Sequence, residues 1–351
     1  MANPEELRAL RGAVADLMAK DASDDGVWSE LAAMGLLGLL VPEQYGGAGA
    51  GSVEVGVVAE ELGRVLFAGP YLSTAVLAVN LLAVVDDPAQ RAAVLPAIAA
   101  GRTRVAVAFA EGDSTRPPAK PATSARGTGV PLLTGEKRFV LDAGSADLLY
   151  VLAATDAGPG VFAVDPAGPG VTVEPLTTVD QSRRLGVVRL ADAPATAVGE
   201  PGAAVDAVTA ALDRSAVALL GEQAGAARRA MEMARDYAKT RYQFGRAIGS
   251  FQAVKHMCAD MLLEAESAVS AARHVAAASG SPGWTADLAL AQAYCSDAFV
   301  FVGATNIQVH GGIGFTWEHP AHRYLRRARS DAQLFGSPSW HRERYLQEIG
   351  A

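Results

Sequence analysis

The sequence predicts a multidomain α+β protein with an all-α N-terminal domain, a middle antiparallel β-sandwich or barrel, and a C-terminal four-helix bundle. Two observations carry this prediction. The spacing of apolar residues changes from helical to strand-like near residue 102 and back again near residue 203. The chain also has 351 residues, 50% of them apolar, which is more than one core usually organises. We therefore place the domains at residues 1–101, 102–202 and 203–351.

The N-terminal region has the pattern of several helices. Leu7, Leu10, Val14 and Leu17 recur at a spacing of three to four residues, which predicts an amphipathic helix over residues 1–20. A short helix and a glycine-rich loop follow. Three further helices are expected at 52–65, 74–85 and 89–101.

The middle region consists of short β-rich runs separated by Gly, Pro and Asp. This alternation of strands and turns is typical of an antiparallel sandwich or barrel. The runs cover residues 104–112, 137–144, 147–154, 160–165, 171–176 and 184–193.

The last region predicts long helices joined by short loops, which is the pattern of a bundle. One apolar stripe runs from Ala216 to Ala238, and a second from Phe251 to Val269. A third helix is expected over residues 284–310, and the Gly-Gly pair that follows it is expected to end it.

Composition narrows the possible functions. The formal net charge is −8 and no run of Lys and Arg exceeds two residues, so we expect no nucleic-acid partner. The charged start lacks the apolar segment of a secretion signal, and polar or glycine residues interrupt the apolar stretches before about 18 residues. We therefore expect no membrane span and a cytoplasmic location, with Cys258 and Cys295 as buried thiols.

Residues 239–261 combine a helix end, a turn and a new helix. Arg241 stands where the first helix is expected to end, and Gly245 lies in the turn. A guanidinium beside a helix N-terminus favours phosphate, and Phe244 in the turn could lie against a planar ring. The same pattern equally fits a plain helix hairpin with a capping Arg and a buried Phe.

Residues 306–329 contain a second break between helices. Gln308 and His310 precede Gly311 and Gly312, a pair that permits close approach of another backbone or a phosphate. A simple turn between two helices would look the same.

The same segment contains Glu318, His319 and His322, residue types that can bind a metal. They lack a convincing set of further ligands, so we predict no metal site.

Three segments, in this order, resemble signatures of the acyl-CoA dehydrogenase family: residues 28–49, residues 241–261 (RYQFGRAIGSFQAVKHMCADM) and residues 308–320 (QVHGGIGFTWEHP). The α, β, α order matches that family over nearly the whole chain. The resemblance implies FAD bound between the β domain and the bundle, a neighbouring subunit that closes the site, and a tetramer built as a dimer of dimers.

Carried over residue by residue, the resemblance implies two sets of cofactor contacts. Arg241 and Phe244 would contact the FAD of one subunit, with Gln252 on the same adenine or pyrophosphate side. The residues expected to reach the FAD across the dimer are Gln308, Val309, His310, Gly311 and Gly312.

The family reaction needs a carboxylate that this chain does not place in the expected position. The reaction removes a proton alpha to a thioester while a hydride leaves the beta carbon for the flavin, and a Glu takes the proton. Most members carry this Glu after the last motif, where this chain has Phe335. Others carry it near the start of the first bundle helix, where this chain has Ser215. Asp213, two residues before Ser215, is the candidate for a displaced base, and Glu222 is the next carboxylate, two turns after Ser215. Asp213 would also fit a structural role as a carboxylate near the helix N-terminus, where the helix dipole favours negative charge.

The β domain departs from the family as well. The chain reads Ala110, Glu111, Gly112, Asp113 where members carry a Thr-Glu-Pro segment, so the hydroxyl expected beside the flavin ring is missing or displaced. Both departures resemble the subunit without a base in two-subunit actinobacterial enzymes that act on sterol side chains.

The substrate would then be an acyl-CoA, either a fatty acyl or a sterol side-chain thioester, and the electron acceptor an electron-transfer flavoprotein. Three alternatives stay open. The chain could be a self-sufficient dehydrogenase with a displaced base, or an oxidase or monooxygenase, for which Asp213 would suit a nitroalkane-oxidase-like reaction. It could also be a homologue without flavin or catalysis.

Overall fold

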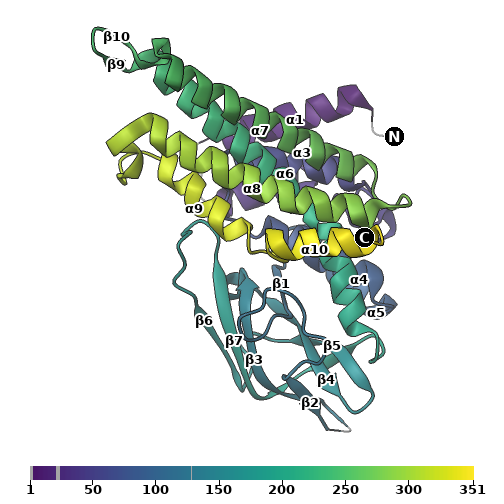
Figure 1. The fold of residues 1–351 in the computed structure, drawn as a ribbon. Helices are drawn as coiled ribbons and strands as arrows, with labels where there is room; N and C mark the ends of the chain where they lie inside the picture. Colours follow the sequence, from purple (N-terminus) through teal and green to yellow (C-terminus); the bar gives the residue numbers. More distant parts are fainter. Residues whose placement is uncertain (1–2, 21–23, 128) are drawn as a thin grey trace. The chain divides into compact units, whose positions relative to one another are not determined.

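The computed structural model describes residues 3–20, 24–127 and 129–351, and it divides into two compact units. The helical unit comprises Met1–Lys20, Ser52–Phe67 and Ala216–Ala351. The sheet unit comprises Asp21–Gly51 and Ala68–Ser215. The predicted fold class is confirmed, because helices precede and follow a central sheet along the chain (Figure 1). The domain limits near residues 101 and 202 stay predictions.

The sheet unit contains one eight-stranded sheet in the order β6-β7-β3-β2-β4-β5-β8, with β1 paired to β4. The strands are β1 Val105–Ala108, β2 Ser124–Arg126, β3 Leu132–Leu141, β4 Leu148–Thr155, β5 Gly158–Val164, β6 Val171–Pro175, β7 Leu185–Pro194 and β8 Thr196–Val198.

The sheet is mixed, so the purely antiparallel prediction needs a correction. β1 pairs with β4 in parallel, and β2 meets β4 in parallel through Ser124 and Ala154. Parallel neighbours cannot be joined by a tight turn, and here the chain passes through β2 and β3 before it returns as β4. The apolar residues of the parallel and the antiparallel strands belong to one core, which includes Val151, Phe162 and Val188.

The helices that lie entirely within the sheet unit precede its first strand, except for the short η4, which follows β3. Asp87 is the N-cap of α5 and Pro88 its first residue; the Asp87 carboxylate accepts a hydrogen bond from the Gln90 N–H at 2.9 Å. The segments are α2 Asp24–Ala33, η1 Leu36–Gly38, η2 Glu43–Tyr45, the π-helix η3 Tyr71–Ala78, α4 Val79–Val84, α5 Pro88–Ala99 and η4 Ala143–Ser145.

The helical unit is built around long helices that lie side by side (Figure 1). Asn3 caps its first helix by accepting a hydrogen bond from the Glu5 N–H at 3.0 Å; residues 1 and 2 of the predicted helix lie outside the described residues. The helices are α1 Pro4–Met18, α3 Ser52–Arg64, α6 Ala204–Thr240, α7 Gln252–Ala277, α8 Trp284–His310, η6 Gly311–Phe315, α9 Ala321–Asp331 and α10 Pro338–Glu348. The part of α6 up to Ser215 belongs to the sheet unit. A small hairpin of β9 (Tyr242–Gln243) and β10 (Arg246–Ala247), followed by η5 (Ile248–Ser250), connects α6 to α7.

Helix α8 has the predicted limits and is the most apolar of the long helices. Gly311 ends it with a φ of 64°, a backbone conformation that glycine adopts without strain. Among the described residues, the stretch Trp284–Phe315 is the one helical segment long and apolar enough to cross a membrane. Its most apolar window is 61% buried inside the protein, and α8 packs against α7, α9 and α10, so it serves as a core helix here. Cys295 on α8 is buried as predicted, whereas Cys258 on α7 is half-buried.

Glycines let α3 and α6 meet backbone to backbone. A Cβ atom added to Gly225 of α6 would lie 1.9 Å from the Glu60 carbonyl oxygen of α3. A Cβ atom added to Gly63 of α3 would lie 2.1 Å from the Glu222 carbonyl oxygen of α6. Nothing larger than glycine therefore fits at either position without separating the two helices.

We predict that Gly225→Ala destabilises the protein by roughly 1–3 kcal/mol, since overpacking forces the backbones apart. Gly56→Ala is the matched control, because its Cβ would meet Ala276 and Val217 at the ordinary distances of 3.6 and 3.9 Å. The control should be neutral or about 0.5–1 kcal/mol more stable, since alanine suits a helix better than glycine. Chemical unfolding measures the free energy of unfolding of both variants. Equal values for Gly225→Ala and Gly56→Ala would contradict the close contact of α3 and α6 at Gly225.

Candidate functional site

The connection between α6 and α7 presents an aromatic side chain to solvent. β9 and β10 pair through Gln243 and Arg246, and the turn residues Phe244 and Gly245 have φ values of 54° and 75°. Phe244 is 90% exposed, which excludes the alternative of a buried Phe at this turn. Its ring packs edge to face against Phe251 at a centroid distance of 6.1 Å.

This exposed aromatic turn has the properties of a contact surface. A bulky residue at positive φ costs of order 1–3 kcal/mol, and such strain collects at functional sites. Arg241 is exposed at the start of the hairpin, and its carbonyl accepts a hydrogen bond from the Ile248 N–H at 2.8 Å. Gln252 is the first residue of α7, whose N-cap Phe251 offers no side-chain hydrogen bond. Free N–H groups at the start of α7 and the nearby cation suit an anionic group.

The second predicted segment, at the end of α8, has one exposed and one buried side. Gln308, Gly311 and Gly312 are exposed, so they are accessible to another molecule. Val309 is 6% exposed and belongs to the apolar core of the helical unit, and His310 is 5% exposed. The side chains of Val309 and His310 are therefore occupied within their own chain, whereas their neighbours face outward.

The ring of His310 contacts two other rings. Its Nδ1 lies 2.8 Å from the Asn306 carbonyl oxygen, and its ring centroid lies 4.3 Å from that of Tyr237, which stacks on it, and 4.3 Å from that of His319, which is tilted. Burial lowers the pKa of His310, and burial also lowers that of His319, so both rings favour the neutral form.

Tyr237 brings the two predicted segments together. It lies one turn before Arg241 on α6 and stacks on His310 of α8, so both segments stand at the same end of the helical unit. Figure 1 shows the β9–β10 hairpin at this end. The two cofactor contact sets implied by the resemblance therefore come from one end of a single chain. Tyr237 was not among the predicted residues, because nothing in its local sequence distinguishes it from other helical aromatics.

The loop between α9 and α10 holds Phe335 where most members of the resembled family carry their base. Phe335 is 1% exposed and has a φ of 61°, and Gly336 follows at 124°. The backbone at this position thus adopts a conformation that L-residues rarely tolerate, yet the side chain is a buried hydrocarbon ring. A phenyl ring cannot accept a proton.

The alternative base positions on α6 are Ser215 and Asp213, and both are buried. The Ser215 hydroxyl donates to the Ala211 carbonyl at 2.6 Å and accepts from the Asn80 amide at 3.1 Å. Asp213 is 8% exposed and lies in the third turn of α6, which begins at Ala204. The explanation of Asp213 as a helix N-terminal carboxylate is therefore wrong, because the dipole effect fades within the first turn.

Glu222, the other carboxylate on this helix, lies beside a buried guanidinium. Its Oε2 is 3.8 Å from Nη1 of Arg327, which is 1% exposed. Glu222 is itself 5% exposed, so its environment suits a structural ion pair rather than a base that meets substrate.

The segment after β1 is closed by a buried ion pair that the sequence did not reveal. Lys137 of β3 is fully buried, and its Nζ donates to Glu111 Oε1 at 2.6 Å. The Glu111 carboxylate also accepts from the N–H groups of Ala122 and Thr123, at 2.6 and 2.9 Å. Ala110 beside it is 2% exposed and has no hydroxyl. The Glu111 carboxylate and the Lys137 ammonium group are thus bound within the sheet unit.

This pair shifts the pKa of both partners. Burial lowers the pKa of Lys137 to about 8, although Glu111 opposes the shift. Burial works to raise the pKa of Glu111, but the hydrogen bonds from Lys137, Thr123 and Ala122 outweigh it and lower the pKa. No local signal in the sequence pairs two residues that stand 26 positions apart.

The residues present fit one end of an FAD molecule better than the other. Arg241, Phe244 and the Gly311–Gly312 pair are exposed and offer a cation, an aromatic face and open backbone, which suit the adenine and pyrophosphate end. Two positions to which the resemblance assigns a role near the flavin ring differ in chemistry: position 110 of the sheet unit carries a methyl group, and position 335 of the helical unit carries a phenyl group. This chain therefore offers neither a hydroxyl at position 110 nor a base at position 335.

Comparison with known proteins places the chain among well-described relatives. The family model "Acyl-CoA dehydrogenase, N-terminal domain" matches residues 5–102, and the model "Acyl-CoA dehydrogenase, C-terminal domain" matches residues 205–349. The chain is 32% identical to acyl-CoA dehydrogenase IpdE2 of Mycobacterium tuberculosis, over 96% of this chain and 95% of that protein.

Two solved structures are similar over almost their full length. The chain is 28% identical to a chain of the ChsE4-ChsE5 complex from Mycobacterium tuberculosis, with a TM-score of 0.87 over 99% of this chain and 98% of the other. It is 30% identical to a chain of the Tcur3481-Tcur3483 steroid ACAD, with a TM-score of 0.86 over 99% and 98%.

We predict that the buried Lys137 makes stability depend on alkaline pH. Its folded-state pKa of about 8 lies below the ordinary lysine pKa of 10.5, so the folded state binds fewer protons than the unfolded state between these values. The free energy of unfolding therefore rises with pH across this window, by at most about 1.4 kcal/mol per pH unit.

Lys137→Met should remove this pH dependence, whereas Lys120→Met, at an exposed lysine of the same unit, should keep it. Chemical unfolding at several pH values between 7.5 and 10 measures the slope for each protein. The same slope in Lys137→Met and in the unsubstituted chain would show that Lys137 does not titrate in this range.

Proposed function

Because the chain belongs to the acyl-CoA dehydrogenase family, we propose that it is the subunit without a base in a two-subunit, FAD-dependent enzyme that dehydrogenates an acyl-CoA thioester. Members of this family are FAD-dependent oxidoreductases that act on CH–CH bonds. The single observation that carries the proposal is Phe335, a buried phenyl ring at the position where the resemblance places the catalytic Glu of most members.

The chemistry explains why a second subunit is needed. A proton alpha to a thioester is weakly acidic, so its removal needs a positioned carboxylate whose pKa suits the reaction. FAD, when bound, accepts the hydride from the beta carbon. Phe335 excludes water from its surroundings but takes no proton, and Ser215 has its hydroxyl bound to Ala211 and Asn80. The base would therefore come from a homologous partner that carries the Glu.

This chain would contribute to binding the cofactor rather than to proton transfer. The Arg241 guanidinium would pair with the pyrophosphate, and the exposed ring of Phe244 would lie on a planar part of the molecule. Gln252, Gln308 and the backbone at Gly311 and Gly312 would complete these contacts. Val309 and His310 would act through their backbone and by holding the end of α8, since their side chains are buried in the helical unit.

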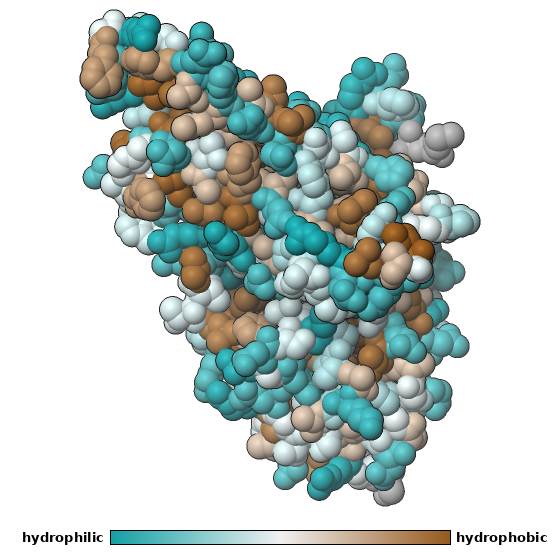
Figure 2. All heavy atoms as spheres, viewed as in Figure 1, coloured by the Kyte–Doolittle hydropathy of each residue, from teal (hydrophilic) through white to brown (hydrophobic). Residues whose placement is uncertain are grey.

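An exposed apolar patch at the same end supports the proposed assembly. Five large apolar residues there are 41–90% exposed, which is unusual for a surface that faces only water. They are Tyr242, Phe244, Ile313, Phe315 and Trp317. Figure 2 shows apolar side chains on the β9–β10 end of the bundle. A partner subunit that covers this patch would bring the cofactor contacts of both chains together in a tetramer.

The relatives support a second subunit and suggest the substrate. One similar structure is named as the ChsE4-ChsE5 complex, and another as the Tcur3481-Tcur3483 steroid ACAD. A heterotetramer that acts on a sterol side-chain thioester, or on a fatty acyl-CoA, is the corresponding proposal here. An electron-transfer flavoprotein would then accept the electrons, and the enzyme would work in the cytoplasm.

A displaced base within this chain is the second candidate, and one observation favours it. Asp213 is a carboxylate that is 8% exposed, two residues before Ser215 on α6. It therefore lies close to the position at which other members of the resembled family carry their base. In that case the chain would be a self-sufficient dehydrogenase.

We predict that Asp213→Asn, purified with a Glu-bearing homologue, keeps acyl-CoA turnover within about twofold, whereas replacing the partner's Glu by Gln lowers it by at least about 100-fold. Turnover is measured with an acyl-CoA and an artificial electron acceptor. The displaced-base candidate is supported instead if Asp213→Asn causes the large loss. A circular dichroism spectrum shows that each variant is folded.

We also predict that Arg241→Ala lowers the flavin content of the purified assembly at least fivefold, because a charge-assisted contact to the pyrophosphate is lost. Arg235→Ala is the matched control, since Arg235 is an exposed residue of α6, the helix that ends just before Arg241, and it pairs with Asp236 at 2.8 Å. The ratio of flavin absorbance to protein is the measurement. Equal flavin content in both variants would remove Arg241 from the proposed site.

A further inference from the structure

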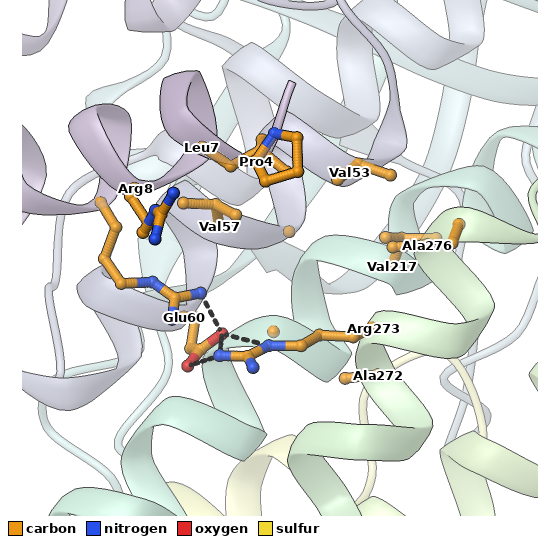
Figure 3. A pocket seen from close by; sticks show the side chains of 14 residues that line it. Pro4, Leu7, Arg8, Val53, Val57, Glu60, Val217, Ala272, Arg273 and Ala276 are labelled. Carbon is orange, nitrogen blue, oxygen red and sulfur yellow. Dashed lines mark hydrogen bonds and ion pairs between the residues drawn. The ribbon is translucent and has the colours of Figure 1, made fainter. Parts of the chain in front are cut away.

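A pocket of about 360 Å³ opens in the helical unit between α1, α3, α6 and α7 (Figure 3). Its volume lies in the range of small-molecule sites. Most of its wall is apolar and is formed by Leu7, Val53, Val57, Val217 and Ala276. None of these residues belongs to the site proposed above, so the pocket has no role in the reaction described so far.

One end of the pocket is charged. Glu60 is 5% exposed, and its carboxylate accepts hydrogen bonds from Arg273 at 2.8 Å and from Arg11 at 2.9 Å (Figure 3). Arg228 also approaches Glu60, at 4.0 Å. Among the described residues Arg8 forms no ion pair, although it also lines the pocket.

The polar end is therefore net positive. The residues that line the pocket include three arginines, Arg8, Arg11 and Arg273, and one carboxylate, that of Glu60. Glu61, which is not a lining residue, lies 3.6 Å from Arg11. The side chains of Arg11 and Arg273 remain 31% and 49% exposed while they bind Glu60, so both can still contact a ligand. A guanidinium group binds a carboxylate through two parallel hydrogen bonds, and Arg8 is available to do so.

The width of the apolar part depends on a missing side chain at Gly56. A Cβ atom there would meet Ala276 and Val217 only at 3.6 and 3.9 Å, so this wall has room. There is no room for a side chain at Gly221 on the opposite helix, because a Cβ atom there would lie 2.8 Å from the Gly56 carbonyl oxygen. The close contact of α3 and α6 thus forms the floor of the pocket, and Gly56 leaves its side open.

We infer that this pocket binds an alkyl carboxylate, with the carboxylate at Arg8, Arg11 and Arg273 and the alkyl chain along the valine wall. The apolar wall and the cationic end together match an amphiphile with one anionic head and a short unbranched tail. A neutral alcohol of the same chain length would make the apolar contacts, but its hydroxyl group would form no ion pair with the arginines. The pocket lies apart from Arg241 and Phe335, so this binding does not depend on the proposed dehydrogenation.

Calorimetric titration of the purified assembly with octanoate, and separately with 1-octanol, tests the inference. Octanoate should bind saturably and at least fivefold more tightly than 1-octanol. Arg8→Glu should weaken octanoate binding at least fivefold. Arg102→Glu, at an exposed residue outside the pocket lining, should leave it unchanged.

A second pair of variants tests the apolar part. Gly56→Leu should fill the space beside Val217 and weaken octanoate binding at least tenfold, whereas Gly56→Ala should fold normally and keep most of it. If Gly56→Leu does not fold, the octanoate affinity of Arg8→Glu still tests the inference. Octanoate binding that neither Arg8→Glu nor Gly56→Leu alters would overturn the inference, as would equal binding of 1-octanol. Absence of octanoate binding, with a changed sedimentation coefficient for Gly56→Leu, would identify the groove as a subunit interface and also overturn it.

Discussion

The close crossing of α3 and α6 is the constraint on which the helical unit depends. Gly63 and Gly225 let the two backbones touch, and the residues beside them then occupy fixed positions. From the end of α3, the Arg64 carbonyl accepts a hydrogen bond from the Tyr324 hydroxyl of α9 at 2.6 Å. The carbonyl of Phe67 accepts one from Arg327 at 3.3 Å. Helix α9 is thereby fixed to α3, and it leads directly into the loop that carries Phe335.

The same crossing buries charge, which has an energetic cost. Burial raises the pKa of Glu61, with Arg64 and Arg11 opposing the shift, so its ionised form is disfavoured in the folded state. Each buried carboxylate on α3 is accordingly placed beside guanidinium groups, Glu60 with Arg11 and Arg273, and Glu61 with Arg64. Buried ion pairs of this kind contribute little net stability, but removal of one partner is costly. They fix the register of α1, α3 and α7 around the pocket.

Local signals in the sequence predicted most of the long helices and long strands, but they did not predict contacts between distant residues or short elements such as β2 and β8. The limits of α8 and its end at Gly311 follow from apolar spacing and a glycine stop, and both are confirmed. The parallel pairing of β1 with β4 depends on strands about 40 residues apart, so the sequence pattern could not reveal it. For the same reason Lys137, Tyr237 and the glycine crossing were missed. Phe244 could be placed in its turn, but its exposure depends on the absence of a neighbour, which periodicity does not report.

The candidate site therefore divides into a part that this chain offers and a part that it lacks. It offers an exposed cation, an exposed aromatic ring and open glycine backbone at one end of the helical unit, whereas position 335 is a hydrocarbon. The most direct measurement is the flavin-to-subunit ratio and the mass of the chain purified alone and together with a Glu-bearing homologue. The account predicts a colourless or unstable lone chain, and a yellow tetramer of the pair that holds fewer flavins than subunits. A lone chain that forms a yellow homotetramer, and that an acyl-CoA bleaches, would contradict it.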